Sequence, residues 1–281
     1  MSQAWMDRVR SRDLPARKLL TCLMAMSTIR YWHSLTSPEA SGLAEQNPVA
    51  ILPLAAIEQH GPHLPLSTDL DIGLGLLANA FGHLSENFAA WALPPQSVGA
   101  SQEHTQFAGT LHLSPNVLSR IIQYYGIALA RSGVRRLLIS NSHGGNRPSV
   151  EAAALRLRFE QKQLVVIFNY TDIAPPDSLS LPSNEVHHGF HGGAIETAMM
   201  QHLHPDRVRT KHIRQFDSFG EELQKKGSTV KPVGAASFAW LAKDLNPCGA
   251  VGDATLATAA MGQALVEHYG RILASVIRDV Q

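Results

Sequence analysis

Short apolar runs alternate with longer amphipathic stretches from about Tyr31 to the C-terminus of this chain. The apolar runs predict buried strands at 49–55, 135–140 and 164–168. Pro53 lies within the first run. Because proline has no N–H to donate to a sheet, it favours a strand end or a sheet edge at that position.

The amphipathic stretches predict helices between and after these strands. Ser114 and Pro115 form a good N-cap and first-turn pair, and Gly133 is a natural stop for the helix that they begin. Asp253 is expected to cap a long C-terminal helix that reaches towards Val280. The other predicted helices lie at 72–83, 148–160 and 194–203.

The order of these elements predicts an α/β fold. A strand, a glycine-rich turn, a helix and a second strand follow one another between 135 and 168, which is typical of a βαβ unit. We therefore expect a layered α/β/α sandwich with a mostly parallel central sheet. The chain has no internal repeat or obvious linker, so residues 31–281 are expected to form a single domain.

The first thirty residues combine several arginines with a short apolar run at 19–26. This pattern has some likeness to a secretory signal, but the run is at the short limit and lacks a convincing cleavage site. We expect residues 1–30 to be a poorly ordered N-terminal extension, with Met24 or Met26 as the native start; a targeting segment is the alternative. No later stretch approaches the ~20 apolar residues needed to span a bilayer.

Composition narrows the possible partners. The chain has 24 Lys and Arg residues against 23 Asp and Glu residues, for a formal net charge of +1. No overall field would therefore recruit nucleic acid or an anionic membrane, and a small-molecule partner fits better. Cys22 and Cys248 are far apart and lack a metal-binding spacing, which is compatible with a reducing, cytoplasmic location.

Three separated blocks place carboxylates or imidazoles beside glycines at predicted turns, namely 58–63 with Asp69, 141–146 and 191–197. Carboxylate oxygens and neutral imidazole nitrogens are the ligands that zinc, manganese and iron share. The first two blocks follow predicted strands, and ligands in open α/β sheets collect at the carboxyl ends of the strands. The sequence therefore predicts a metal site at this edge, with Glu58, His60 and Asp69 around one or two cations and His143 closing the cluster.

Other interpretations of these blocks are weaker. A single histidine beside glycine is more often a turn residue than a ligand. The turn at 143–146 would also suit a phosphate, because a glycine turn before a helix presents N–H groups, but it lacks the lysine of a P-loop. No G-x-S-x-G motif supports a serine nucleophile.

The chain resembles the creatininase (creatinine amidohydrolase) family. The resemblance rests on four stretches in the family's order, 52–69, 103–110, 141–146 and 191–197, with a weaker match at 249–253. It implies the fold expected above, a homohexamer, and a binuclear centre with two divalent metal ions per subunit, zinc, manganese or iron. Creatininases carry a glutamate two positions after the histidine matching His143, where this chain has Gly145.

The resemblance also implies a role for each matching residue. Glu58 and His143 would hold one ion, His60 the other, and Asp69 would bridge them. His191 is the candidate proton donor or oxyanion stabiliser, and Glu196 is a further metal ligand, replacing the glutamate absent at Gly145, or a proton shuttle; water alone is the other way to complete the second site. The expected substrate-binding residues are His104, Phe190 and Trp240, with Trp91 and Phe107 as further candidates.

These expectations converge on a metal-dependent amidohydrolase that uses metal-activated water on a small-molecule amide, formamide or lactam C–N bond. Phe190 stands where a creatininase has an acidic group, so creatinine itself is not expected. The His-Gly-Gly-Asn sequence looks more like that of relatives such as a pyrimidine deformylase and the mycofactocin precursor peptidase. The alternatives are a short-peptide peptidase and a non-catalytic metal-binding paralogue.

Overall fold

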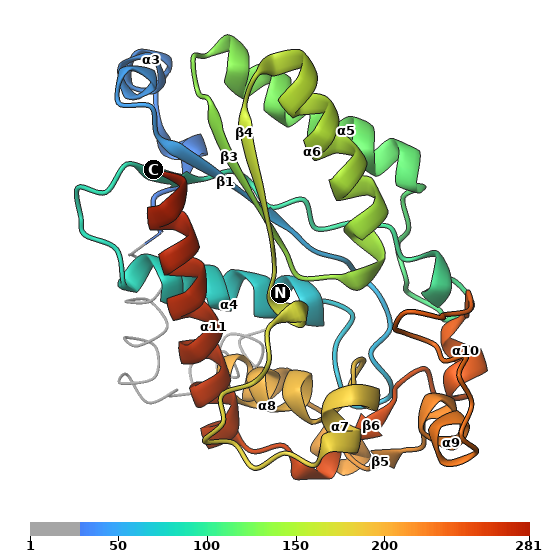
Figure 1. Ribbon diagram of the computed structural model, residues 1–281. Coiled ribbons are helices and arrows are strands. Elements are labelled where there is room, and N and C mark those ends of the chain that lie inside the picture. Colours follow the sequence, from blue (N-terminus) through green and yellow to red (C-terminus); the bar gives the residue numbers. More distant parts are fainter. Residues whose placement is uncertain (1–28) are drawn as a thin grey trace, which may run out of the picture.

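The computed structural model describes residues 29–281 (Figure 1). Within them, four strands form a parallel sheet in the order β2-β1-β3-β4. The strands are β1 (Val49–Leu54), β2 (Ala90–Ala92), β3 (Arg136–Asn141) and β4 (Leu164–Asn169). The three predicted strands are confirmed to within a residue or so. The short strand β2 was not predicted, because three residues are too few to show a period.

Helices cover both faces of the sheet (Figure 1). One face packs against α4 (Thr68–Gly82), α8 (Ala194–Leu203) and α11 (Ala259–Val280), and the other against α5 (Pro115–Arg131) and α6 (Arg147–Gln161). The predicted α/β/α sandwich with a parallel sheet is therefore confirmed.

Side chains of β1 alternate between the two cores. Val49 and Ile51 belong to the core with α4, α8 and α11, whereas Leu52 and Leu54 belong to the core with α5 and α6. All four are buried. A strand buried on both faces needs apolar residues at every position, which explains the unbroken apolar run in the sequence.

Pro53 lies near the end of β1, which confirms the first of the two predicted alternatives; β1 is an internal strand and not a sheet edge. The carbonyl of Pro53 accepts a hydrogen bond from the N–H of Gln96. In a strand the N and O of one residue point to the same side, so the Pro53 nitrogen faces the segment that follows β2 and not β3. The missing N–H therefore removes no hydrogen bond between β1 and β3.

The start of α4 differs from the predicted one. The helix begins at Thr68 and not at Ile72, so Asp69 lies in its first turn rather than in the preceding loop. A metal-binding residue on a helix is held more rigidly than one on a loop, because the helix fixes its backbone.

The cap predicted for the last helix was also wrong. Asp253 accepts a hydrogen bond from the N–H of Thr255 at the 3₁₀ turn Ala254–Leu256, whereas α11 begins only at Ala259. Thr258 caps α11 by accepting from the N–H of Met261. Both Asp and Thr are good N-caps, so the sequence alone did not decide between the two positions.

Several short elements were not predicted. They are the helices α3 (Ser37–Glu45), α7 (Ser183–His188), α9 (Phe219–Lys225) and α10 (Ala242–Leu245), the antiparallel strands β5 (Gln215–Phe216) and β6 (Gly252–Asp253), and the 3₁₀ turns Trp32–Ser34, Gln102–His104, Gly144–Asn146, Tyr170–Asp172, Pro205–Arg207 and Thr210–His212. Most lie in loops at the carboxyl edge of the sheet, below β4 in Figure 1. Residues of α7 and of the turns Gln102–His104, Gly144–Asn146 and Tyr170–Asp172 line the cavity of the candidate site.

The expected N-terminal extension at 1–30 falls outside the described residues, except for its last two positions. Ile29 is buried, and Arg30 donates hydrogen bonds to the carbonyls of Ala90 and Glu86. In the part of the chain that the structure describes, no helix is both long enough and apolar enough to cross a membrane.

Candidate metal centre

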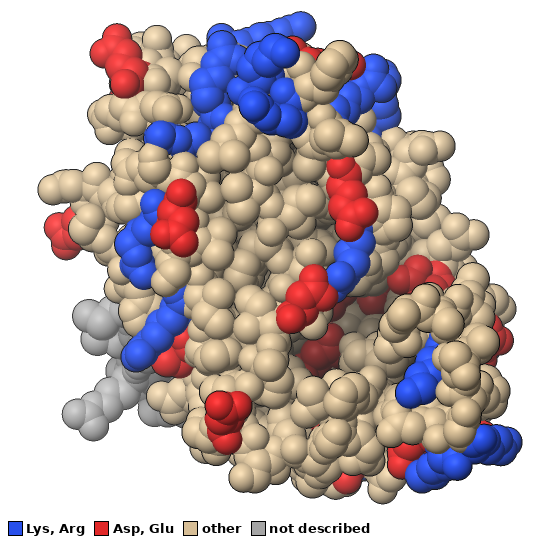
Figure 2. Space-filling view, in the orientation of Figure 1, with Lys and Arg blue, Asp and Glu red and all other residues tan. Residues whose placement is uncertain are grey.

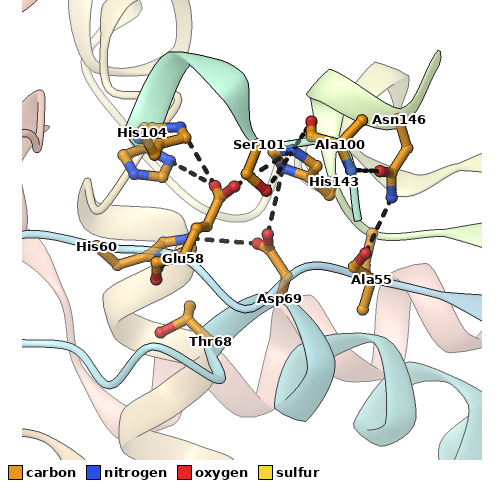
Figure 3. Close-up of polar contacts among 12 residues, drawn as sticks. Ala55, Glu58, His60, Thr68, Asp69, Ala100, Ser101, His104, His143 and Asn146 are labelled. Atoms are coloured by element: carbon orange, nitrogen blue, oxygen red, sulfur yellow. Dashed lines mark hydrogen bonds and ion pairs between the residues drawn. The ribbon is translucent and has the colours of Figure 1, made fainter. Parts of the chain in front are cut away.

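The first and second sequence blocks meet because β1 and β3 are paired neighbours. The last residues of the two strands, Leu54 and Asn141, are partners in the register, so the loops that follow them leave the sheet side by side. Glu58 lies on the first loop and His143 on the second. Figure 3 shows the side chains of Glu58 and His143 pointing toward each other next to the first turn of α4. The carboxylate of Asp69, on that turn, points toward both of them.

Asn146 ties these loops together. Its side-chain nitrogen donates to the carbonyl of Ala55 (3.0 Å), and its side-chain oxygen accepts from the backbone N–H of Ala100 (2.8 Å). The amide therefore joins the loop after β1, the loop after β3 and the segment that leads to His104. The sequence block contained Asn146, but its spacing gave no indication of this structural role.

The first group of candidate ligands consists of Glu58, Asp69 and His143. Glu58 Oε2 lies 3.3 Å from His143 Nε2, and Asp69 Oδ2 lies 3.3 Å from His143 Nδ1. One ligand atom from each residue lies within 4.8 Å of the others. We call this group the first triad.

The second triad consists of His60, Asp69 and Glu196. His60 Nε2 lies 3.2 Å from Asp69 Oδ1 and 3.9 Å from Glu196 Oε2, and the three ligand atoms again lie within 4.8 Å of one another. Asp69 belongs to both triads and directs a different oxygen to a histidine of each. The structure therefore brings together all five residues predicted as metal ligands, in two groups that share one carboxylate.

The third sequence block is held in place by Glu185, a residue that sequence reasoning missed. Its carboxylate accepts hydrogen bonds from the backbone N–H of Ala194 (2.7 Å) and of Asp253 (2.6 Å) and is buried. Glu196, in the first turn of α8, in turn accepts from the N–H of Gly192 (2.6 Å). No motif marks Glu185, because its partners are backbone groups distant in sequence.

Burial dominates the electrostatics of the triads. It raises the pKa of Glu58 to about 8, although the adjacent His143 opposes the shift. For His60, burial alone would lower the pKa, but the carboxylates of Asp69 and Glu196 outweigh it and raise the pKa to about 10. The cluster therefore retains protons on groups whose metal-binding forms are deprotonated, so metal binding would release protons.

The cluster fits divalent metal ions. Both carboxylate oxygens of Glu58 and Oδ2 of Asp69 are buried and have no hydrogen-bond partner among the described residues. Burying unpartnered carboxylate oxygens is costly unless a cation neutralises them. Three carboxylates and two imidazoles in one buried cluster form a donor set that zinc, manganese and iron all accept.

A cavity of about 730 Å³ opens over the triads. Figure 2 shows the hollow in the surface, with acidic side chains in its depth. All three residues predicted to bind substrate line it, namely His104, Phe190 and Trp240. The rings of Phe190 and Trp240 lie 5.8 Å apart and form part of its wall. Arg147 and Asp172, which no sequence motif had marked, also line the cavity and form an ion pair.

The two further aromatic candidates for substrate binding, Trp91 and Phe107, do not line the cavity. Trp91 is part of β2 and is not among the residues that line the cavity. Phe107 packs under the ammonium group of Lys243, which lies 5.2 Å from the ring centre, and it is also absent from the lining. Neither residue is placed to contact a ligand over the triads.

Gly145 has no room for a side chain. A Cβ atom at this position would lie 2.4 Å from the carbonyl oxygen of Ala100 and 2.4 Å from Glu103 Oε1. The φ angle of Gly145 is not positive, so the close approach of the neighbouring loop, and not backbone strain, accounts for glycine here. Glu103 was not predicted as a site residue, yet it lines the cavity with Oε1 3.7 Å from His143 Nε2.

Comparison with known proteins identifies the family of the chain. The family model described as creatininase, creatinine amidohydrolase, matches residues 33–277. The chain therefore belongs to the creatininase family. It is 30% identical over 250 residues to the mycofactocin precursor peptide peptidase of Mycobacterium ulcerans, covering 87% of this chain and 88% of the relative. It is 31% identical over 176 residues to the creatinine amidohydrolase of Pseudomonas putida, covering 57% of this chain and 66% of the relative.

Solved creatininase structures share the fold. One described as a manganese creatininase superposes with a TM-score of 0.70 at 24% identity and covers 89% of this chain and 98% of its own. A creatininase variant of the Zn–Zn type superposes with a TM-score of 0.70 at 23% identity, covering 89% of this chain and 97% of its own.

Proposed function

We propose that this protein is a metal-dependent amidohydrolase with two divalent ions, one in each triad, and Asp69 between them. The observation that carries the proposal is the pair of buried carboxylate and imidazole triads that share Asp69 at the base of a cavity. The manganese and zinc forms of the solved creatininases support such a cofactor. Bound ions of this kind lower the pKa of a shared water and polarise the carbonyl of an amide.

His191 is the proposed proton carrier. Its Nε2 lies 2.8 Å from the main-chain oxygen of Gln59 and donates to it, which leaves the lone pair of Nδ1 on the side of Glu58 Oε1, 3.8 Å away. From this position Nδ1 accepts a proton from the attacking water and returns it to the departing nitrogen. His191 would therefore act first as a base and then as the proton donor that the sequence predicts.

Glu196 is proposed as a ligand of the second ion and not as the proton shuttle. Its Oε2 already accepts the N–H of Gly192 and lies on the side of His60. A carboxylate held by a backbone N–H is fixed in orientation, which suits coordination better than movement of a proton. The non-catalytic alternative is disfavoured, because a structural site is normally closed and this one lies under an open cavity.

The substrate class has two candidates. The first is the small-molecule amide, formamide or lactam expected from the sequence. The second is a short peptide. A cavity of about 730 Å³ is in the range of pockets that enclose drug-sized ligands, which either class can include. The likeness to the mycofactocin precursor peptidase favours the peptide.

A substrate panel with metal analysis tests this proposal. The purified protein is expected to contain zinc, manganese or iron at close to two ions per subunit and to hydrolyse members of a panel of N-formyl compounds, lactams and short peptides. Asp69→Asn is the matched inactive variant, and activity must be absent from it. Metal-free protein that remains metal-free after incubation with each ion would contradict the proposal, as would activity that Asp69→Asn retains.

A further inference from the structure

Gln59, which lies between Glu58 and His60 in the sequence, has a side chain of fixed orientation. Its Oε1 accepts a hydrogen bond from the backbone N–H of Gly61 (3.0 Å), and its Nε2 donates to the carbonyl of Gly249 (2.9 Å). A backbone N–H can only donate and a carbonyl can only accept, so these two contacts distinguish the oxygen of the amide from its nitrogen. The side chain is buried, and a Cβ atom on Gly249 would lie 2.2 Å from Gln59 Oε1, so only glycine fits there.

The second hydrogen of this amide determines the tautomer of His104. Gln59 Nε2 lies 2.7 Å from His104 Nδ1 and 3.1 Å from His191 Nε2. Because His191 Nε2 itself donates to the main-chain oxygen of Gln59 at 2.8 Å, the second hydrogen goes to His104 Nδ1, the nearer nitrogen, which therefore carries no proton. A neutral imidazole has one proton, which must then be on Nε2. His104 Nε2 lies 3.3 Å from Glu58 Oε1, so this N–H faces the carboxylate of the first triad.

The main-chain carbonyl of Gln59 determines the tautomer of His191. His191 Nε2 lies 2.8 Å from the carbonyl oxygen of Gln59, which can only accept, so Nε2 carries the proton and Nδ1 does not. The rings of His104 and His191 are stacked with their centres 4.3 Å apart. Both rings are protonated on Nε2, yet one presents an N–H to Glu58 and the other presents a lone pair.

We propose that Gln59 is a positioning residue that makes His104 a hydrogen-bond donor and His191 an acceptor toward the metal-ligand cluster. The proposal rests on the proposed function only for its effect on catalysis. For histidines that bind a metal, loss of the partner that fixes the tautomer commonly costs about 10–100-fold in metal affinity or activity. Here a single residue would fix two imidazoles, one through its side chain and one through its backbone.

Nitrogen NMR of the zinc-loaded protein with ¹⁵N-labelled histidines tests the proposal, because the ring shifts report which nitrogen carries the proton. The His104 and His191 signals are assigned by their loss in His104→Gln and His191→Gln. In the parent, both are expected to be protonated on Nε2. In Gln59→Glu the carboxylate accepts instead of donating, so His104 is expected to move its proton to Nδ1, while His191 keeps its own on Nε2.

Gln163→Glu is the matched control. Gln163 is also buried and donates to a backbone carbonyl, that of Val134, but lies outside the cavity lining. It is expected to leave both tautomers unchanged. A parent protein with His104 protonated on Nδ1 would overturn the proposal even if Gln59→Glu failed to fold, and so would a Gln59→Glu variant with an unchanged His104.

The same measurements separate this proposal from the proposed function. If the parent bound no zinc and hydrolysed no amide, the proposed function would fail, but the tautomers of His104 and His191 in the metal-free protein would still test the role of Gln59. If zinc bound and amides were hydrolysed while the tautomers differed from those expected, only the role of Gln59 would fail.

Discussion

The two triads offer the same kinds of ligand but are supported differently. Glu58 and His143 of the first triad follow adjacent, hydrogen-bonded strands, and Asn146 joins their loops. Glu196 of the second triad stands on α8, which packs against the sheet but does not follow a strand, and depends on Glu185 to hold the start of that helix. The first triad is therefore part of the central sheet architecture, whereas the second depends in part on peripheral loops.

This difference in support predicts which of the two triads loses its metal ion more readily. Paired strands and their cores are the most stable part of a domain, and loops tied by single hydrogen bonds open at lower free energy. We expect the second triad to lose its ion first. Because Asp69 belongs to both triads, a substitution of Asp69 should affect both ions.

The largest effect is expected from Asp69→Ala. Without this carboxylate neither ion has its full set of ligands, and two cations side by side would repel each other. Both ions and all activity should be lost, as measured by elemental analysis and turnover. Asp71→Ala on the same helix is the control, because Asp71 pairs with Arg207 and belongs to neither triad. Two ions and near-normal turnover in Asp69→Ala would exclude a shared carboxylate.

The difference between support by paired strands and support by loop contacts also explains how much of the site the sequence could predict. The positions of Glu58 and His143 follow from a general rule, since ligands after parallel strands meet at one edge of the sheet. The roles of Glu185 and Gln59 depend on hydrogen bonds to backbone groups that are distant in sequence. Such contacts leave no periodic pattern or spacing, so only the folded chain reveals them.

Glu196→Gln should affect the second triad alone. An amide oxygen is a weaker ligand than a carboxylate, so the metal content is expected to fall towards one ion per subunit. Glu103→Gln is the matched control in the same cavity and should retain both ions. Adding Gly145→Glu should not restore the second ion, because the new side chain would collide with the backbone of Ala100. An unchanged content of two ions in Glu196→Gln would place Glu196 outside the metal site.

His191→Ala should leave both triads in place. The imidazole is proposed to carry a proton and not to bind an ion, so the expected change is a fall in kcat of ~10²–10⁴-fold with unchanged metal content. Steady-state kinetics and elemental analysis on the same preparation measure both quantities. Loss of an ion would instead assign His191 Nδ1 to coordination, next to Glu58 and His60.

The smallest effect should come from one methyl group beside the first triad. Gly145→Ala would place a Cβ 2.4 Å from the Ala100 carbonyl, so the loop must shift, at a cost of about 1–3 kcal/mol typical of overpacking. A Cβ on the adjacent Gly144 would meet no neighbouring atom within 4 Å, and its φ is not positive, so Gly144→Ala should be close to neutral. Thermal unfolding of the two variants should differ by several degrees in Tm, with Gly145→Ala the lower. Equal Tm values would mean that the loop at Ala100 yields freely, which would contradict rigid support of the first triad on this side.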